Sequence, residues 1–140
     1  MKRQIVSLIG VLGLLLVAAC ANAQTVKVTV NVPFDFVVDK ATLPAGAYSI
    51  DEITRGSAAL AIRNRDAGVG MMQLANQARS LNASPDTRLV FHRYGERYFL
   101  SQIWVAGERS GREFPISKRE AEMAKNSQPS ENVIVLAELR

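Results

Sequence analysis

His92 is the only histidine in the chain, and Cys20 is the only cysteine. Zinc sites in proteins need three or four ligands, most of them histidine or cysteine side chains. Use of His92 as a general base would need a nucleophile beside it, and the nearby Ser101 has no G-x-S-x-G context. The sequence therefore predicts no metal site and no catalytic residue, and we expect His92 to have a structural or surface role.

Pairs of carboxylates can also carry out acid–base chemistry, as they do in glycosidases. Asp51 and Glu52 are adjacent in a predicted strand, so their side chains should point to opposite faces. Glu120 and Glu122 lie in a predicted helix, and we expect both to be solvated. The sequence therefore indicates no carboxylate pair, and only the fold could assemble one.

Gly68-Val69-Gly70 is the closest approach to a phosphate-binding loop. A dinucleotide-binding loop is longer, follows a strand and opens a helix, whereas this segment precedes another predicted strand. We therefore interpret it as part of a turn and expect no cofactor.

One cluster has the composition of a binding face: Tyr94, Tyr98 and Trp104 together with Arg93 and Arg97. Aromatic side chains on a sheet can stack on sugars or peptides, and tyrosine and tryptophan also carry a polar group. The competing interpretation places Trp104 in the core of a central strand with Tyr98 as its neighbour. We expect the core position for Trp104 and keep the five residues as a candidate binding face.

The elements that would position these residues are mostly strands. Residues 25–38 are apolar at every second position, which is typical of a strand with one buried face. Pro33 cannot donate a backbone hydrogen bond, so it predicts an edge position, a bulge or a break into two strands. Leu43-Pro44-Ala45-Gly46 predicts a turn, because proline presets one backbone angle and glycine allows another that is rare elsewhere.

Further short strands follow at intervals of about 8–12 residues, the spacing of an all-β sandwich or barrel. Two polar segments, 76–87 and 106–111, are predicted to be loops. We expect a single antiparallel domain of about seven or eight strands, arranged as a sandwich or a barrel. Its later strands are predicted at 47–53, 58–63, 69–75, 88–93, 97–105 and 133–139.

One short helix is predicted over residues 118–125. Ser117 and Glu120 have the spacing of a capping box, in which serine accepts from the third amide and glutamate reaches back to the serine amide. A helix of this length is marginal in isolation, so it must dock on the rest of the domain.

The first 23 residues are interpreted as a cleavable export signal. A basic start at Lys2 and Arg3 precedes an apolar run and the small-x-small site Ala21-Asn22-Ala23. Cleavage there would leave residues 24–140 as one domain without a membrane span. The alternative is lipidation of Cys20, because Val17-Ala18-Ala19-Cys20 fits a lipoprotein signal; the short tether to the first strand favours simple cleavage.

Charge gives little indication of a partner. The chain has a formal net charge of +4, and loss of Lys2 and Arg3 with the signal would leave 15 basic against 13 acidic residues. Proteins that bind nucleic acid usually present a concentrated basic face, so we expect no nucleic acid partner.

Three stretches resemble a group of small exported bacterial proteins of unknown function. These are V-x-V-P-F-x-F (residues 30–36), L-P-A-G-x-Y (43–48) and F-H-R-Y-G-x-R-Y-F-L (91–100). The resemblance covers most of the chain after the signal, although the group usually has an acidic residue where Ala47 stands. It implies export and a compact β fold, and it transfers no functional site.

These observations lead to one expectation and two alternatives for function. We expect a non-enzymatic periplasmic or secreted module that binds a partner or structural component of the cell envelope or exterior. The first alternative is a lipocalin-like carrier of a small apolar ligand, which would need an internal cavity. The second is a small hydrolase whose site is assembled by the fold, which would need His92 and carboxylates to converge in a cleft.

Overall fold

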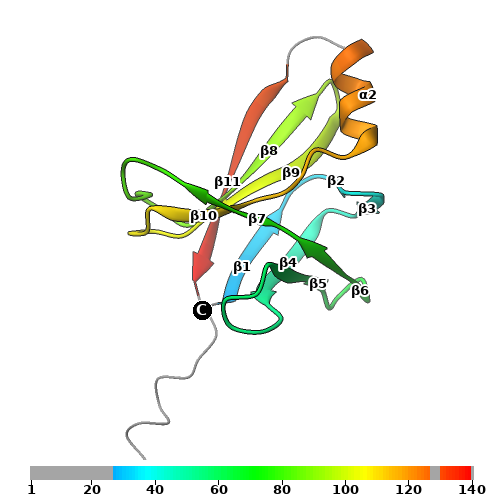
Figure 1. The fold of residues 1–140 in the computed structure, drawn as a ribbon. Coiled ribbons are helices and arrows are strands. Elements are labelled where there is room, and N and C mark those ends of the chain that lie inside the picture. The colour runs from blue at the N-terminus through cyan, green and yellow to red at the C-terminus, as the bar shows by residue number, and fades with distance from the viewer. Residues whose placement is uncertain (1–26, 127–129, 140) are drawn as a thin grey trace, which may run out of the picture.

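The computed structural model of the chain describes residues 27–126 and 130–139. The predicted signal and the lipidation site at Cys20 lie outside these residues. The described part contains eleven strands and one helix (Figure 1): β1 (Lys27–Val32), β2 (Phe36–Val38), β3 (Ala41–Leu43), β4 (Gly46–Glu52), β5 (Ala59–Asn64), β6 (Val69–Leu74), β7 (Asn76–Arg79), β8 (Arg88–Tyr94), β9 (Arg97–Trp104), β10 (Ser110–Glu113), α2 (Lys118–Asn126) and β11 (Glu131–Leu139).

The strands form a nearly closed, barrel-like sheet. β1 pairs with β4, β4 with β5, and β5 with β6, and the chain then continues through Ala75 into β7. β7 pairs with β10, β10 with β9, β9 with β8, β8 with β11, and β11 returns to β1. β2 pairs in parallel with β9 at Phe99, and β3 pairs with the other edge of β2. These two short strands therefore extend the sheet beyond the ring.

The prediction of a mainly β, barrel-like domain with one helix is therefore confirmed, but the predicted number of strands is wrong. Pro33 breaks the first predicted strand, so that β1 ends at Val32 and β2 begins at Phe36. β7 and β10 lie largely in segments predicted as loops, and they form because each supplies the other's backbone partners. Neither has an alternating apolar pattern, so their sequences did not indicate strands.

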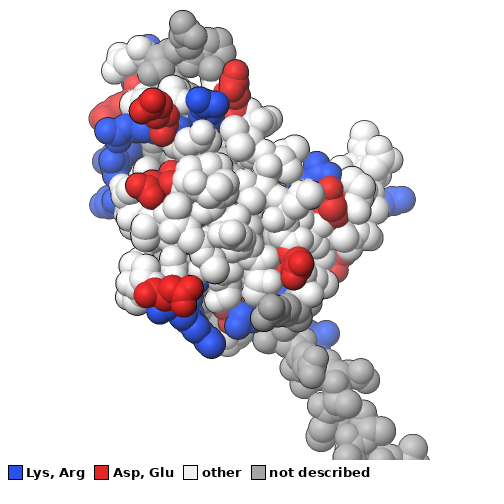
Figure 2. Space-filling model, turned by 180° about the vertical axis from the view of Figure 1, so that it is seen from behind, with Lys and Arg blue, Asp and Glu red and all other residues white. Residues whose placement is uncertain are grey.

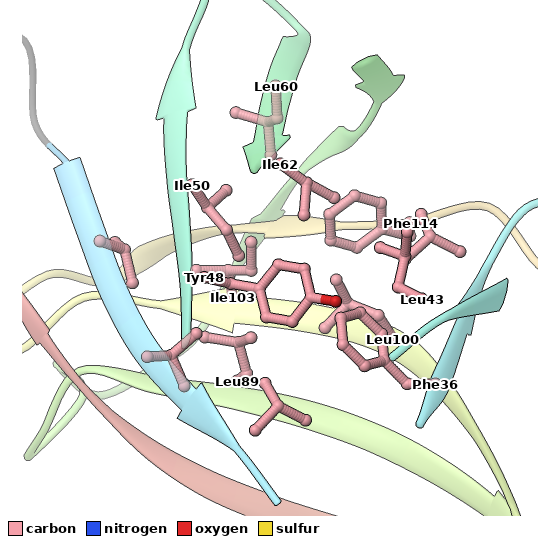
Figure 3. Close-up of a cluster of buried hydrophobic side chains, with 14 of the residues drawn as sticks. Phe36, Leu43, Tyr48, Ile50, Leu60, Ile62, Leu89, Leu100, Ile103 and Phe114 are labelled. Carbon is pink, nitrogen blue, oxygen red and sulfur yellow. The ribbon is translucent and has the colours of Figure 1, made fainter. Parts of the chain in front are cut away.

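The interior of the barrel is filled by side chains from all around the ring (Figure 3). The alternate residues predicted to face inward do so: Val28, Val30 and Val32 on β1 meet Tyr48 and Ile50 on β4. The largest side chains that are almost fully buried are Phe36, Phe91, Ile62, Leu89, Val32 and Val38.

Aromatic rings form a continuous row through this core. Phe91 packs edge-to-face against both Phe34 and Phe36, with ring centroids 5.0 and 5.4 Å away. Phe36 in turn packs edge-to-face on Tyr48 at 5.1 Å, and Phe34 stacks on Tyr98 at 3.7 Å. Such pairs contribute about 0.5–1.5 kcal/mol each beyond the area they bury.

The L-P-A-G-x-Y stretch is a structural anchor. The buried Tyr48 hydroxyl donates to the Pro44 carbonyl oxygen at 2.5 Å, and burial raises the pKa of Tyr48, which keeps the hydroxyl a donor. Gly46 has φ of 151°, and a Cβ atom there would lie 2.8 Å from Nδ2 of Asn64. Glycine is favoured here because any other residue would be strained at this φ and would have to displace the Asn64 amide.

Helix α2 covers the outer side of the sheet where β2, β8 and β9 meet (Figure 1). Val37, Tyr94 and Phe99 form a second small apolar cluster there, against which Met123 of the helix packs. In residues 27–126 and 130–139, no helix has both the length and the apolar character needed to cross a membrane.

Candidate functional site

A β-bulge decides where Trp104 lies. Phe91 pairs with Leu100, but Val90 pairs with Gln102, so Ser101 is an extra residue in β9. The extra residue shifts the alternation by one, and Ile103 joins Leu100 in the core while Trp104 turns to the outer face. The prediction that Trp104 is a core residue is therefore wrong: its side chain is half-buried on the outside of the sheet.

The other members of the candidate binding face are divided between two places. Tyr98 lies at the end of the barrel, stacked on Phe34, with the Arg93 guanidinium carbon 5.6 Å from its ring centroid. Tyr94 is buried beneath α2, and Arg97, its partner across the hairpin, is exposed. The structure thus brings Arg93 and Tyr98 together and separates them from Tyr94 and Trp104, so the five residues do not form one surface.

His92 is tied to a carboxylate from α2. Its Nδ1 lies 2.6 Å from Oε1 of Glu120, and the Tyr94 hydroxyl donates to the same oxygen at 3.2 Å. Burial raises the pKa of Tyr94, with a further contribution from the Glu120 carboxylate, so the hydroxyl remains protonated and able to donate. Together these contacts fasten the helix to β8.

The prediction that Glu120 is solvated is wrong, because the residue is only 4% exposed. The Ser117 hydroxyl accepts from the Glu120 amide at 3.2 Å, which is the serine half of the predicted capping box. The glutamate side chain, however, turns inward to His92 and Tyr94 rather than back to the serine amide. The sequence signal for the helix start was thus correct, while the destination of the carboxylate depended on the sheet below.

A groove borders Trp104 on the outer face of β8, β9 and β11. It has a volume of about 360 Å³. Trp104 and Gln102 come from β9, and Val90 and Ile134 are cross-strand partners on β8 and β11. The remaining wall is the segment 80–85, and the full lining is Ser80, Asn82, Ala83, Ser84, Pro85, Arg88, Val90, Gln102, Trp104, Asn132 and Ile134.

Two connecting segments hold the groove wall in place. The amide of Ser80 donates to the Arg109 carbonyl at 2.8 Å, and the amide of Ser84 donates to the Glu108 carbonyl at 2.9 Å. The amide of Gly107 donates to the Ser84 carbonyl at 2.8 Å. The segments predicted as loops at 76–87 and 106–111 are therefore joined to each other, and the wall is preorganised.

The lining of the groove carries little charge. Arg88 is the one ionised side chain that lines the groove, and it forms an ion pair with Asp86. Seen from behind Figure 1, the molecule shows a broad central area without charged side chains and charged groups nearer its edges (Figure 2).

A second hollow, of about 500 Å³, lies at one mouth of the barrel and has a charged rim. Glu52 and Arg112 face each other there at 2.5 Å, and Arg112 also donates to the Ser57 carbonyl. Burial alone would raise the pKa of Glu52, but hydrogen bonds from Arg112 and the Gly56 amide and the charges of Arg112 and Arg55 lower it. The ion pair links the β4–β5 connection to β10, which is a structural role.

The described residues contain no group of three or more His, Cys, Asp or Glu side chains placed to hold a metal ion. Within the same part of the chain, no serine hydroxyl forms a hydrogen bond with the His92 imidazole. Four pockets of the described residues are lined by neither His92 nor Glu120.

Comparison with protein-family models, with curated proteins and with solved structures finds no match to this chain. The resemblance to small exported bacterial proteins therefore stays a prediction. The residues that carry it now have structural roles, because Phe36, Tyr48 and Phe91 fill the core and His92 holds α2.

The groove is the feature that sequence reasoning missed. Gln102 and Trp104 alternate in the sequence, which could have shown that they share a face. The bulge at Ser101 and the joined segments behind the groove, by contrast, have no sequence signal.

Proposed function

We propose that this chain is an exported, non-enzymatic binding module, and that the Trp104 groove is its ligand surface. The observation that carries the proposal is a half-buried tryptophan beside a wall held by backbone hydrogen bonds. Tryptophan is enriched at binding sites because it offers a large apolar area together with a polar group. A preorganised wall lowers the entropic cost of binding.

The filled interior favours surface binding over transport of an apolar ligand inside the barrel. Phe36, Phe91 and Ile62 are each at most 2% exposed and fill the part of the interior around them. The hollow of about 500 Å³ at the barrel mouth reaches the core residues Val28, Ile50, Leu60 and Ile103, but its rim is charged, and an apolar ligand that went deeper would have to displace core side chains.

The surroundings of His92 support a structural role over a catalytic one. A general base must reach a substrate proton, directly or through one water. A carboxylate at Nδ1 would leave Nε2 free to act as the base, as in a catalytic triad, but in the described residues no serine hydroxyl hydrogen-bonds to the ring and His92 lines none of those four pockets. His92→Ala should therefore be less stable than wild type, and any measured hydrolytic activity should be the same in both proteins.

Export is tested by processing of the full chain in a Gram-negative host. We expect the mature protein in the periplasm, beginning at Gln24 and without lipid. Mass spectrometry that finds a diacylglyceryl group on Cys20 would instead make the protein membrane-anchored, and retention of residues 1–23 in the cytoplasm would overturn export.

Binding is tested by co-sedimentation of the mature protein with isolated bacterial envelopes. Wild type should sediment with the envelopes, and Trp104→Ala should stay in solution. Ile134→Glu is the second groove variant; its side chain is 51% exposed, so the fold should tolerate the charge. The matched control is Met72→Ala, an exposed apolar residue on β6 that should sediment like wild type.

Equal sedimentation of all four folded proteins would refute the groove as the ligand surface. Failure of the wild type to sediment would refute an envelope component as the partner. Circular dichroism of each variant shows whether it is folded.

A further inference from the structure

We infer that the ligand of the Trp104 groove is an uncharged carbohydrate, an inference that rests on the proposed function. Three properties of the groove support this class of ligand: the side chains that line it, its lack of free charge and the pairing of its strands.

The groove presents amide and hydroxyl groups beside its aromatic ring. Gln102 accepts from the Trp104 indole N–H at 3.0 Å, which leaves both hydrogens of its amide nitrogen free to donate. In the described part of the chain, the Asn82 and Asn132 side chains form no hydrogen bond with other protein groups. Three side-chain amides can therefore donate to and accept from hydroxyl groups, whereas a purely apolar ligand would leave them without partners.

The Trp104 ring is held in one position. A Cβ atom at Gly111 would lie 2.6 Å from Cε3 of the indole, so the ring rests directly on the glycine backbone of β10. Its N–H is bound to Gln102, and the residue remains partly exposed at the groove. A fixed, partly exposed indole suits the C–H face of a sugar ring, because stacking then costs no side-chain ordering.

The charge of the groove disfavours ionic ligands. Arg88 is its one ionised side chain, and Asp86 already neutralises it. A polyanion or a polycation would therefore find no unpaired opposite charge among the residues that line the groove.

Most of the groove floor offers no free backbone groups. β8 is paired with β9 and β11, and the Gln102–Trp104 part of β9 is paired with β8 and β10. Among the described residues, the Glu131–Leu136 part of β11 is paired with β8 alone, because β1 pairs only with Ala137–Leu139. Peptides that bind to sheets usually add a strand to a free edge, so a peptide would pair at this edge of β11, whereas a ligand on the groove floor must bind through side chains.

The test is titration of the mature protein with soluble neutral oligosaccharides: cellotetraose, maltotetraose and fully N-acetylated chitotetraose. Trp104 is the only tryptophan, so its emission reports on the groove alone. We expect at least one of the three to shift that emission saturably. Isothermal titration calorimetry should show binding weakened at least tenfold in Gln102→Ala and Trp104→Ala, and unchanged in Met72→Ala.

Two comparison probes distinguish the other classes of ligand, namely heparin oligosaccharide as a polyanion and a soluble alanine-rich peptide. Binding of either probe at Trp104, with none of the neutral sugars bound, would overturn the carbohydrate inference and leave the binding module in place. Loss of envelope sedimentation in Trp104→Ala without binding of any neutral sugar would do the same. Sugar binding that survives both groove substitutions would place the carbohydrate site elsewhere and overturn the inference as well.

Discussion

The attachment of α2 should depend on the Glu120 carboxylate. In Glu120→Ala, the Tyr94 hydroxyl and His92 Nδ1 both lose the oxygen to which they now bind. Tyr94 is 8% exposed, so water cannot fully replace that partner, whereas the His92 side chain is 26% exposed and can be partly hydrated.

The expected cost follows from these exposures. A buried polar group left without a partner costs about 1–3 kcal/mol, and removal of one member of a fully buried ion pair costs about 3–5 kcal/mol. Because His92 is partly hydrated, we expect a cost centred where these two ranges meet, about 2–4 kcal/mol. For a domain of this size that corresponds to a fall in Tm on the order of 10 °C.

Urea unfolding followed by circular dichroism measures the free energy, and hydrogen exchange of the α2 amides shows where it is lost. Glu122→Ala is the matched control, because it lies on the exposed side of the same helix and should change stability by less than about 0.5 kcal/mol. A double-mutant cycle with His92→Ala should give a coupling of about 1–3 kcal/mol. If Glu120→Ala were as stable as the Glu122 control, with α2 equally protected, the carboxylate would not be what holds the helix.

Three further predictions test the core, a turn and the barrel mouth. Phe91→Ala should lower the free energy of unfolding by about 3–5 kcal/mol in urea, and Trp104→Ala by less than half as much, since only Phe91 is fully buried. Equal losses would show that Trp104 is a core residue. Gly46→Ala should destabilise by at least about 1 kcal/mol, because the new Cβ meets a side chain at 2.8 Å and φ is positive; an unchanged Tm would contradict this. The lowered pKa of Glu52 stabilises the fold at pH values above the usual carboxyl pKa, and this stability is lost as the pH falls through the folded pKa. Wild type should therefore lose more stability than Arg112→Gln between about pH 7 and about pH 3. Parallel losses would show that the ion pair is not the cause.

The strands with strong alternation could be predicted because their signal is local. In β1 every second side chain is apolar, and β4 and β5 keep this pattern at Tyr48 and Ile50 and at Leu60 and Ile62; a strand with one buried face requires it. The break at Pro33 and the start of α2 at Ser117 were also indicated locally, since they depend on one ring and one hydroxyl. The short strand β7 was missed because its partner β10 lies more than 30 residues away in the chain, and β10, which also pairs with the nearby β9, was missed because it lacks an alternating apolar pattern.

The candidate sites show the same division. By itself the sequence determined the inward and outward faces of the regular strands, the turns and the start of the helix, because these follow from backbone sterics and hydrophobic periodicity. Only the tertiary structure decided that Ser101 is a bulge and that Trp104 therefore leaves the core, because register depends on the hydrogen bonds of both neighbouring strands. It also decided that Glu120 is buried, since the carboxylate's environment is set by His92 and Tyr94 on a strand 26–28 residues away.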